Sequence, residues 1–284
     1  MRLLIFFFIT TQVFSQINWT SFNTSTSDIP YNQIKALEFD ANGNLFVGTA
    51  YGLGILNIEN NSWDVYFNDD PDIGLIDNDI INISKSLTDS MWICTTNGIS
   101  IFFNQQWSYL NMNNSILPSN ISRTIFFEND AKTWIGTTSG LIVIENNIWD
   151  LQLFDSEGIF SNNIRKIIKD PENENIYIGT LNGGFQIYNN GNFEGFNNLN
   201  SGLLDNTIND FIFDINNNLI MSTPFGGLGV LTENNSWTWF NSVTYPYLPF
   251  FINSLNNLII DNNNNLWIST VENGLIKYTN NTWT

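Results

Sequence analysis

The sequence lacks histidine altogether, contains one cysteine, and has only nine basic residues among 284. The absence of histidine removes histidine general bases, Ser-His-Asp triads and histidine metal sites in one step. A single cysteine cannot form an intramolecular disulfide. Without a histidine to activate it, Cys94 is also a poor nucleophile, so we interpret it as a small buried residue.

The scarcity of basic residues leaves the chain strongly acidic, with 27 aspartates and glutamates and a net charge of −18. Such a surface repels phosphate backbones and anionic lipid headgroups, so we expect neither nucleic acid nor an acidic membrane as a partner. The charge favours solubility. A cation-rich partner or a bound cation is the alternative that it leaves open.

The chain also lacks a long hydrophobic run. Arg2 precedes an apolar stretch over residues 3–10, which is too short to span a bilayer. Val13 and Ser15 occupy positions where a signal peptidase accepts them, so cleavage before Gln16 is predicted. We therefore predict a signal peptide over residues 1–15, a single domain over 16–284, no membrane insertion, and export to the periplasm or the extracellular space.

The chain does contain one short sequence motif, or phrase, that is repeated six times. It reads Phe-Val-Gly-Thr-Ala-Tyr-Gly over residues 46–52 and Trp-Ile-Gly-Thr-Thr-Ser-Gly over residues 134–140. A period in the forties built on short strands is typical of propeller blades. The repeated threonines lie 42 to 47 residues apart, at Thr49, Thr95, Thr137, Thr180, Thr223 and Thr270.

Around each phrase the sequence predicts four antiparallel strands. An alternating strand such as 34–39 leads into a polar turn, the phrase forms the second strand, and a glycine turns the chain into a third, such as 53–58. A fourth, outer strand opens with an aromatic residue such as Trp63. The predicted fold class is all-β, a β-propeller of four-stranded antiparallel blades with six repeats. Residues 19–22 resemble one more outer strand, so we expect either six blades, the last completed by this strand, or an incomplete seven.

We interpret the residues that recur at fixed positions of this motif as those that hold the ring together. The aromatic residue fills the space between blades. The small residue before each threonine is expected to permit close backbone approach near the crowded axis of the ring. The threonine is expected to form a hydrogen bond across the turn that follows it.

The repeat resembles the two-component regulator propeller repeat, whose ideal form is Asp-x-x-Gly-Asn-Leu-Trp-Ile-Gly-Thr-x-x-Gly-Leu. Residues 40–53 follow this form closely, and residues 261–275 follow it with Ser269 for glycine and one extra residue. The resemblance implies a periplasmic, sensor-type propeller that responds to saccharides. The sequence contains no transmembrane, kinase or DNA-binding segment of the kind found with such sensors, so we expect any signalling role to need a separate partner.

Enzymatic activity is not predicted. Paired carboxylates could hydrolyse a glycan, but no acidic pair recurs in the repeats, and the absence of histidine argues against lyases that rely on it. The Asp-x-Asn-x-Asn turns resemble the start of a calcium loop, yet Leu266 stands where that loop needs glycine. We expect hairpin turns and no cofactor, with a weak calcium site at Asp40 or Asp214 as the alternative.

The positions that differ between repeats are the candidate binding residues. Each lies two residues after the repeated threonine, in a loop that opens beside the central channel: Tyr51, Asn97, Ser139, Asn182, Phe225 and Glu272. Aromatic rings and amides suit a saccharide, whose ring faces stack and whose hydroxyls need donors and acceptors. The insertion over residues 244–251 is expected to overhang the same face.

These features lead to one functional prediction and two alternatives. We predict a monomeric, exported, non-enzymatic binding or sensor propeller that recognises a saccharide or an envelope protein on its channel face. A structural or assembly module of the cell envelope, without a small-molecule ligand, is the first alternative. A carboxylate-dependent glycan hydrolase or lyase is the second.

Overall fold

The fold is described from a computed structural model, which covers residues 20–70, 74–152, 161–232, 234–245, 254–271, 274–279 and 282–284. The predicted signal peptide, Trp19 and Glu272 lie outside these residues. The described residues contain strands and turns, and no helix among them is long and apolar enough to cross a membrane.

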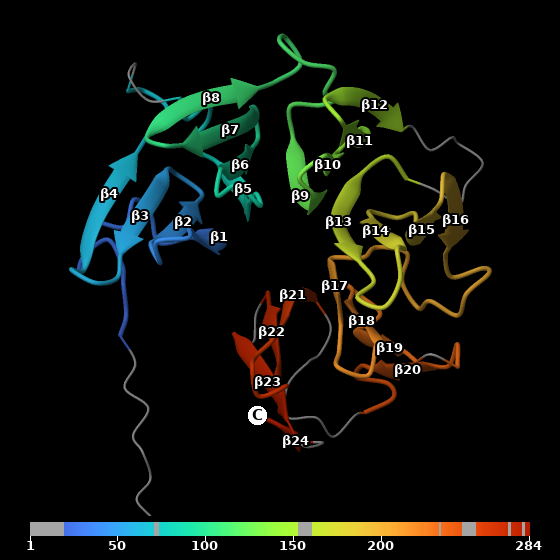
Figure 1. Cartoon of the computed structure of the whole chain (residues 1–284). Helices are drawn as coiled ribbons and strands as arrows, with labels where there is room; N and C mark the ends of the chain where they lie inside the picture. Colours follow the sequence, from blue (N-terminus) through green and yellow to red (C-terminus); the bar gives the residue numbers. More distant parts are fainter. Residues whose placement is uncertain are drawn as a thin grey trace, which may run out of the picture.

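Six four-stranded antiparallel sheets follow one another along the chain as the blades of a six-bladed β-propeller (Figure 1). The first blade contains β1 (Ile34–Phe39), β2 (Leu45–Thr49), β3 (Leu53–Asn57) and β4 (Ser62–Tyr66). The second to fourth blades contain β5 (Ile80–Lys85), β6 (Met91–Thr95), β7 (Gly98–Phe103), β8 (Gln106–Leu110), β9 (Ser122–Asn129), β10 (Lys132–Thr137), β11 (Gly140–Glu145), β12 (Ile148–Gln152), β13 (Ile164–Lys169), β14 (Ile176–Thr180), β15 (Phe185–Asn189) and β16 (Asn192–Phe196). The fifth and sixth contain β17 (Asp210–Phe213), β18 (Leu219–Ser222), β19 (Leu228–Leu231), β20 (Trp237–Phe240), β21 (Leu255–Ile260), β22 (Leu266–Thr270), β23 (Leu275–Thr279) and β24 (Thr282–Trp283).

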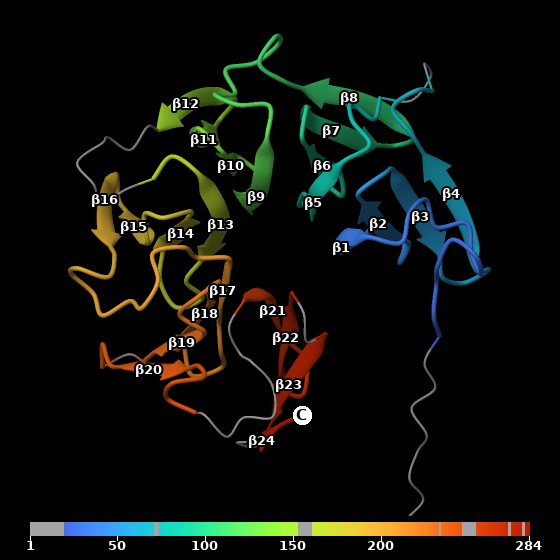
Figure 2. The same cartoon turned by 180° about the vertical axis from the view of Figure 1, so that it is seen from behind.

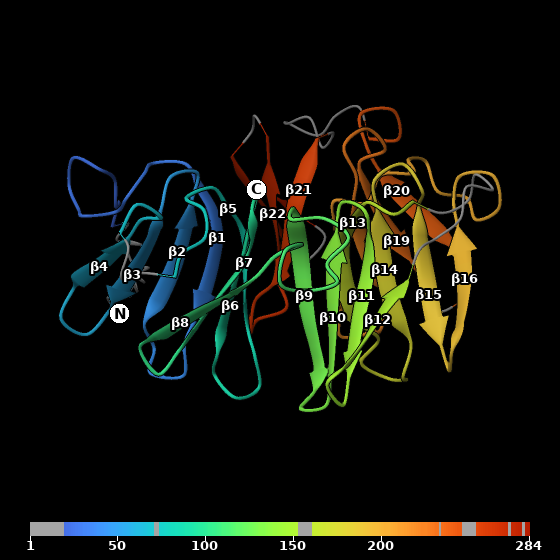
Figure 3. The same cartoon turned by 90° about the horizontal axis from the view of Figure 1, so that it is seen from above.

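The first strand of each blade lies toward the centre of the ring and the fourth at its rim, as Figures 1 and 2 show from opposite sides. Seen edge-on in Figure 3, the strands run across the thickness of the disc, so the hairpin turns gather on its two faces. We call the face that carries the turns between second and third strands the loop face. The fold class predicted from the repeat is confirmed.

Asparagine-rich turns explain why the hairpins close so tightly. The turns between β7 and β8 and between β11 and β12 have two residues each, Asn104–Gln105 and Asn146–Asn147, all with positive φ between 49° and 63°. Two-residue turns of this handedness match the twist of the flanking strands, and asparagine tolerates the conformation better than most residues.

Five apolar clusters hold neighbouring blades together. The first cluster joins Phe46 and Leu53 of the first blade to Ile83 and Met91 of the second, and the other four repeat this arrangement around the ring. Phe46 is almost fully buried there, as is the equivalent Trp134 in a later cluster. The predicted role of the aromatic residue as filler between blades is confirmed.

The small residue before each threonine is also explained by these junctions. A Cβ atom added to Gly136 would lie 2.5 Å from Cγ2 of Ile164, and one added to Gly48 would lie 2.5 Å from Cγ2 of Ile80. In both cases the isoleucine belongs to the next blade. Cys94 fills the same position in the second blade and is fully buried, as predicted.

The junction between the sixth and the first blade differs from the other five. First strands pack in sequence from β1 to β5, β9, β13, β17 and β21, but in the described part of the chain no junction of comparable extent joins β21 to β1. Figure 1 shows these two blades apart. Leu37 on β1 is 59% exposed although the equivalent Ile83 on β5 is 4% exposed, and Leu275 on β23 is 56% exposed although the equivalent Leu53 is 0% exposed. We call these two facing surfaces the seam.

The outer strand of the sixth blade is β24, which pairs with β23. Residues 20–22 form no strand, and Phe22 packs edge-on against Trp63 of the first blade, with ring centroids 5.8 Å apart. In the residues that the structure describes, the N-terminal segment therefore packs on the first blade. The prediction that it completes the last blade was wrong for this part of the segment.

The seam makes a direct prediction about stability. Leu37→Ala should change the free energy of unfolding by less than about 0.5 kcal/mol, because the side chain is largely in water. Ile83→Ala, at the equivalent position inside a junction, should cost about 2–4 kcal/mol through lost burial and a cavity. Urea unfolding of the two variants measures the difference. Equal costs would mean that the seam is closed in solution.

Candidate functional site

The turns on the loop face share one hydrogen-bonded frame. The hydroxyl of each repeated threonine donates to the carbonyl of the glycine that ends the turn, at 2.8 Å for Thr137 and Gly140 and 3.0 Å for Thr270 and Gly274. The equivalent bonds form in the other four blades. The predicted role of the threonine is confirmed.

The same threonine oxygen also accepts a hydrogen bond in three blades. The donor is the backbone N–H of the candidate residue, at 3.0 Å for Tyr51 and 3.1 Å for both Asn97 and Ser139. The threonine therefore fixes the backbone at the position whose side chain varies. Such a turn can change its exposed residue without changing its shape, which is what a site grafted on a constant frame requires.

All five described candidate residues have exposed side chains. Phe225 is 82% and Tyr51 is 55% exposed, and the ring of Tyr51 leans on Phe67 with centroids 5.8 Å apart. The side-chain oxygen of Asn182 accepts a hydrogen bond from Thr207 at 3.0 Å. Glu272 and residues 246–251 of the predicted overhanging insertion lie outside the described residues. That these side chains bind a ligand stays a prediction.

A second set of residues on this side of the ring comes from β-bulges in the first strands. The register shifts between Ile34 and Ala36, and at the matching point of β5, β9 and β13. A bulge adds one unpaired residue and re-aims its side chain. The residues skipped in the four ladders are Lys35, Ile81, Arg123 and Arg165.

The bulge residues lie close to the loop face. Ser122 pairs with Thr137 and Ile164 pairs with Thr180, so each arginine directly follows the partner of a repeated threonine. Two of the bulge side chains contact the segment that leads into the next blade. The Arg165 guanidinium donates to the side-chain oxygen of Asn209 at 3.2 Å, and Lys35 forms an ion pair with Asp79.

The two arginines were missed by reasoning from the repeat alone. Apart from Arg2, they are the only arginines of the sequence, and they lie 42 residues apart, which is one repeat. Burial lowers the pKa of both guanidinium groups, and the positive charge of Arg123 lowers the pKa of Arg165 further. Like charges are thus held near one another in partly desolvated positions.

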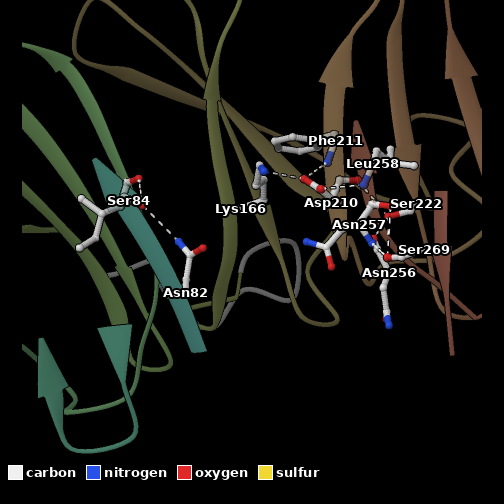
Figure 4. Close-up of polar contacts among 11 residues, drawn as sticks. Asn82, Ser84, Lys166, Asp210, Phe211, Ser222, Asn256, Asn257, Leu258 and Ser269 are labelled. Carbon is white, nitrogen blue, oxygen red and sulfur yellow. Dashed lines mark hydrogen bonds and ion pairs between the residues drawn. The ribbon is translucent and has the colours of Figure 1, made fainter. Parts of the chain in front are cut away.

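Polar side chains on the first strands also tie blades together (Figure 4). Asp210 is almost fully buried, lies 2.8 Å from the ammonium of Lys166 in the preceding blade, and accepts a hydrogen bond from the Leu258 N–H of the following blade at 2.9 Å. On the other side of the ring, the Ser84 hydroxyl donates to the Ile125 carbonyl at 3.1 Å. Because these groups are already paired, we assign them to the framework.

Acidic residues in the turns of the opposite face are engaged by their own loops. Asp40 accepts hydrogen bonds from the backbone of Asn42 and Asn44 at 2.9 and 2.8 Å, and Asp214 accepts the equivalent bonds in its own turn. The indole N–H of Trp267 and the Asn265 amide hold the pKa of the Asp261 carboxyl well below its usual range. The hairpin turns are confirmed, and the weak calcium site at Asp40 or Asp214 stays a prediction.

The described residues offer little for covalent or metal chemistry. Burial raises the pKa of the Cys94 thiol, which keeps it protonated and inert. Within the ranges described above, no group of three or more acidic or cysteine residues could hold a metal ion. A cleft of about 710 Å³ between the first two blades contains Asp40, Asp64 and Asp89, but it opens at the opposite face.

The fold and this site define the class as a six-bladed β-propeller with a constant frame and variable loop-face side chains. No family model matches the chain, and a search of curated proteins found no match. Solved structures do match, at 24% identity or less, and a likeness of this degree shows the fold alone.

The extracellular domain of the hybrid two-component system protein BT3049 from B. thetaiotaomicron has 24% identity and a TM-score of 0.74, covering 96% of this chain and 35% of that one. The chain thus spans about a third of that structure. Virginiamycin B lyase from Staphylococcus aureus has 12% identity and a TM-score of 0.68, covering 89% and 83%. PorZ, a surface component of the type-IX secretion system of Porphyromonas gingivalis, has 17% identity and a TM-score of 0.61, covering 87% and 38%.

The loop frame can be tested through Thr137, which is fully buried. Thr137→Val keeps the shape of the side chain but removes both hydrogen bonds, and should lower the free energy of unfolding by about 1–3 kcal/mol. Thr137→Ser keeps the hydroxyl and serves as the matched control, with a smaller loss. A loss for Thr137→Ser in urea unfolding that equals or exceeds the loss for Thr137→Val would contradict the role assigned to the hydroxyl.

Proposed function

We propose that this chain is an exported, non-enzymatic binding propeller of the sensor type, which recognises a glycan or an envelope protein through its loop face. The observation that supports this proposal is the hydrogen-bonded frame of the loop-face turns. Hydrogen bonds from threonine to glycine recur in all six turns. The residue two positions after the threonine differs between repeats and is exposed in the five turns where the structure describes it. A monomer without nucleic acid or membrane partners fits the acidic surface.

A glycan is the favoured ligand class because of the residue types on this face. Tyr51 and Phe225 offer exposed rings for stacking on sugar faces, and Asn97 and Asn182 offer amides for hydroxyl groups. The similarity to an extracellular domain of a two-component system supports both export and a sensing role.

Catalysis is not favoured, although propeller enzymes are among the similar structures. A histidine-to-alanine variant of virginiamycin B lyase is catalytically inactive, and this chain has no histidine. An ancestral enzyme of glycoside hydrolase family 74 matches at 16% identity. For a hydrolase, the chain would need a pair of free carboxylates facing a ligand. Asp40 and Asp89, in the cleft between the first two blades, both accept backbone hydrogen bonds.

A structural or assembly module of the cell envelope is the second candidate function. One observation favours it, the similarity to PorZ, which is an essential surface component of a secretion system. In that case the loop face would bind another envelope protein and no sugar.

A glycan array probed with the purified chain tests the leading proposal. We expect binding to a restricted set of glycans, with affinity reduced about tenfold or more in a Tyr51→Ala/Phe225→Ala variant, since each stacked ring is worth ~0.5–1.5 kcal/mol. Phe39→Ala/Phe103→Ala removes two exposed aromatics next to turns of the opposite face and should leave affinity unchanged. No glycan binding, or equal affinity in both double variants, would contradict glycan recognition on this face and favour the assembly module.

A further inference from the structure

Among the residues that the structure describes, Arg123 and Arg165 are two cationic side chains that the framework does not explain. They occupy the same bulge position on the neighbouring strands β9 and β13, which pack against each other. Their Nε atoms are buried and have no hydrogen-bond partner. A buried donor without a partner costs free energy, so a native structure that keeps two of them calls for a physical reason.

No carboxylate of the described chain neutralises the pair. Lys132, Lys166 and Lys169 each form ion pairs with acidic residues, whereas neither arginine does in the part of the chain that the structure covers. This is notable because acidic residues outnumber basic ones three to one. The equivalent bulge residue in the first blade, Lys35, is paired with Asp79.

The chemistry of the guanidinium group indicates what would complete the site. Its planar fork of donors matches the oxygens of a carboxylate, sulfate or phosphate, and bonds of this kind are stronger than those between neutral groups. An oxyanion between the two arginines would remove their mutual repulsion and use their free donors. The site lies next to the turns that carry Ser139 and Asn182, through the pairing of Ser122 with Thr137 and of Ile164 with Thr180.

We propose that Arg123 and Arg165 form a binding site for an oxyanion carried by the ligand, a carboxylate or a sulfate ester. The anion site is inferred from the two arginines alone. That the anion belongs to a saccharide rests on the proposed function. Sugar rings would contact the loop-face aromatics and amides, and the acidic group would lie at the arginine pair.

The experiment is isothermal titration calorimetry of the purified chain with three probes, D-glucuronate, D-glucose and inorganic sulfate, at constant ionic strength. Glucuronate should bind at least about tenfold more tightly than glucose. An Arg123→Gln/Arg165→Gln variant should lose at least about tenfold in affinity for glucuronate and for sulfate. The matched control is Lys35→Gln/Lys277→Gln, which removes two charges and one bulge cation but should leave both affinities unchanged.

Two further measurements keep a structural role distinguishable from a binding role. In the absence of anions the Arg123→Gln/Arg165→Gln variant should unfold at the same temperature as the original chain or at a higher one, because the repulsion between the two guanidinium charges has been removed. A clearly lower unfolding temperature would overturn the proposal. Arg165→Lys keeps the positive charge but loses the planar pair of guanidinium donors, so this variant should retain only part of the affinity for glucuronate.

The outcomes separate this inference from the proposed function. Glycan binding that is indifferent to acidic groups and to both arginine substitutions would overturn the anion site and leave the proposed function standing. Binding of sulfate that depends on the arginines, without binding of any saccharide, would support the anion site and contradict glycan recognition. No anion binding at all would overturn the inference.

Discussion

The contact on which the ring depends is the insertion of an aliphatic side chain from one blade into the small-residue position of the blade before it. Ile80 occupies the space above Gly48 and Ile164 the space above Gly136, closely enough that a single added carbon would collide with either one. This interlocking and the aromatic fillers are both part of the apolar clusters that join neighbouring blades. At the seam the equivalent Ile34 is exposed, because within the described residues no blade packs against β1 there as the first blade packs against β5.

This framework leaves the loop face free to vary. The threonine hydroxyl closes each turn from within, so the shape of the turn does not depend on which residue lies at its tip. The bulges in the first strands of blades one to four add to this variation, because each takes one residue out of the ladder and re-aims its side chain. Where that residue is Lys35, a neighbouring aspartate pairs with it; where it is Arg123 or Arg165, no acidic group in the described structure does.

Much of the fold could be predicted because its causes are local. Trp134 and Thr137 recur at a fixed period, and Asn146–Asn147 favours one type of turn, so strands, turns and blades follow from short stretches of chain. Other features could not. The seam depends on which blades meet around the ring, and the proximity of Arg123 and Arg165 depends on two bulges lining up in neighbouring blades.

The sequence by itself determined the all-β class, the number of repeats, the framework role of the recurring residues and the positions that vary between them, since each depends on contacts within one repeat. Only the tertiary structure decided how the repeats meet. It showed that the N-terminal segment packs against the first blade, as Phe22 does on Trp63, that two faces stay open at the seam, and that two arginines one repeat apart become neighbours. The physical reason is that these features arise between repeats, where residues distant in the chain meet.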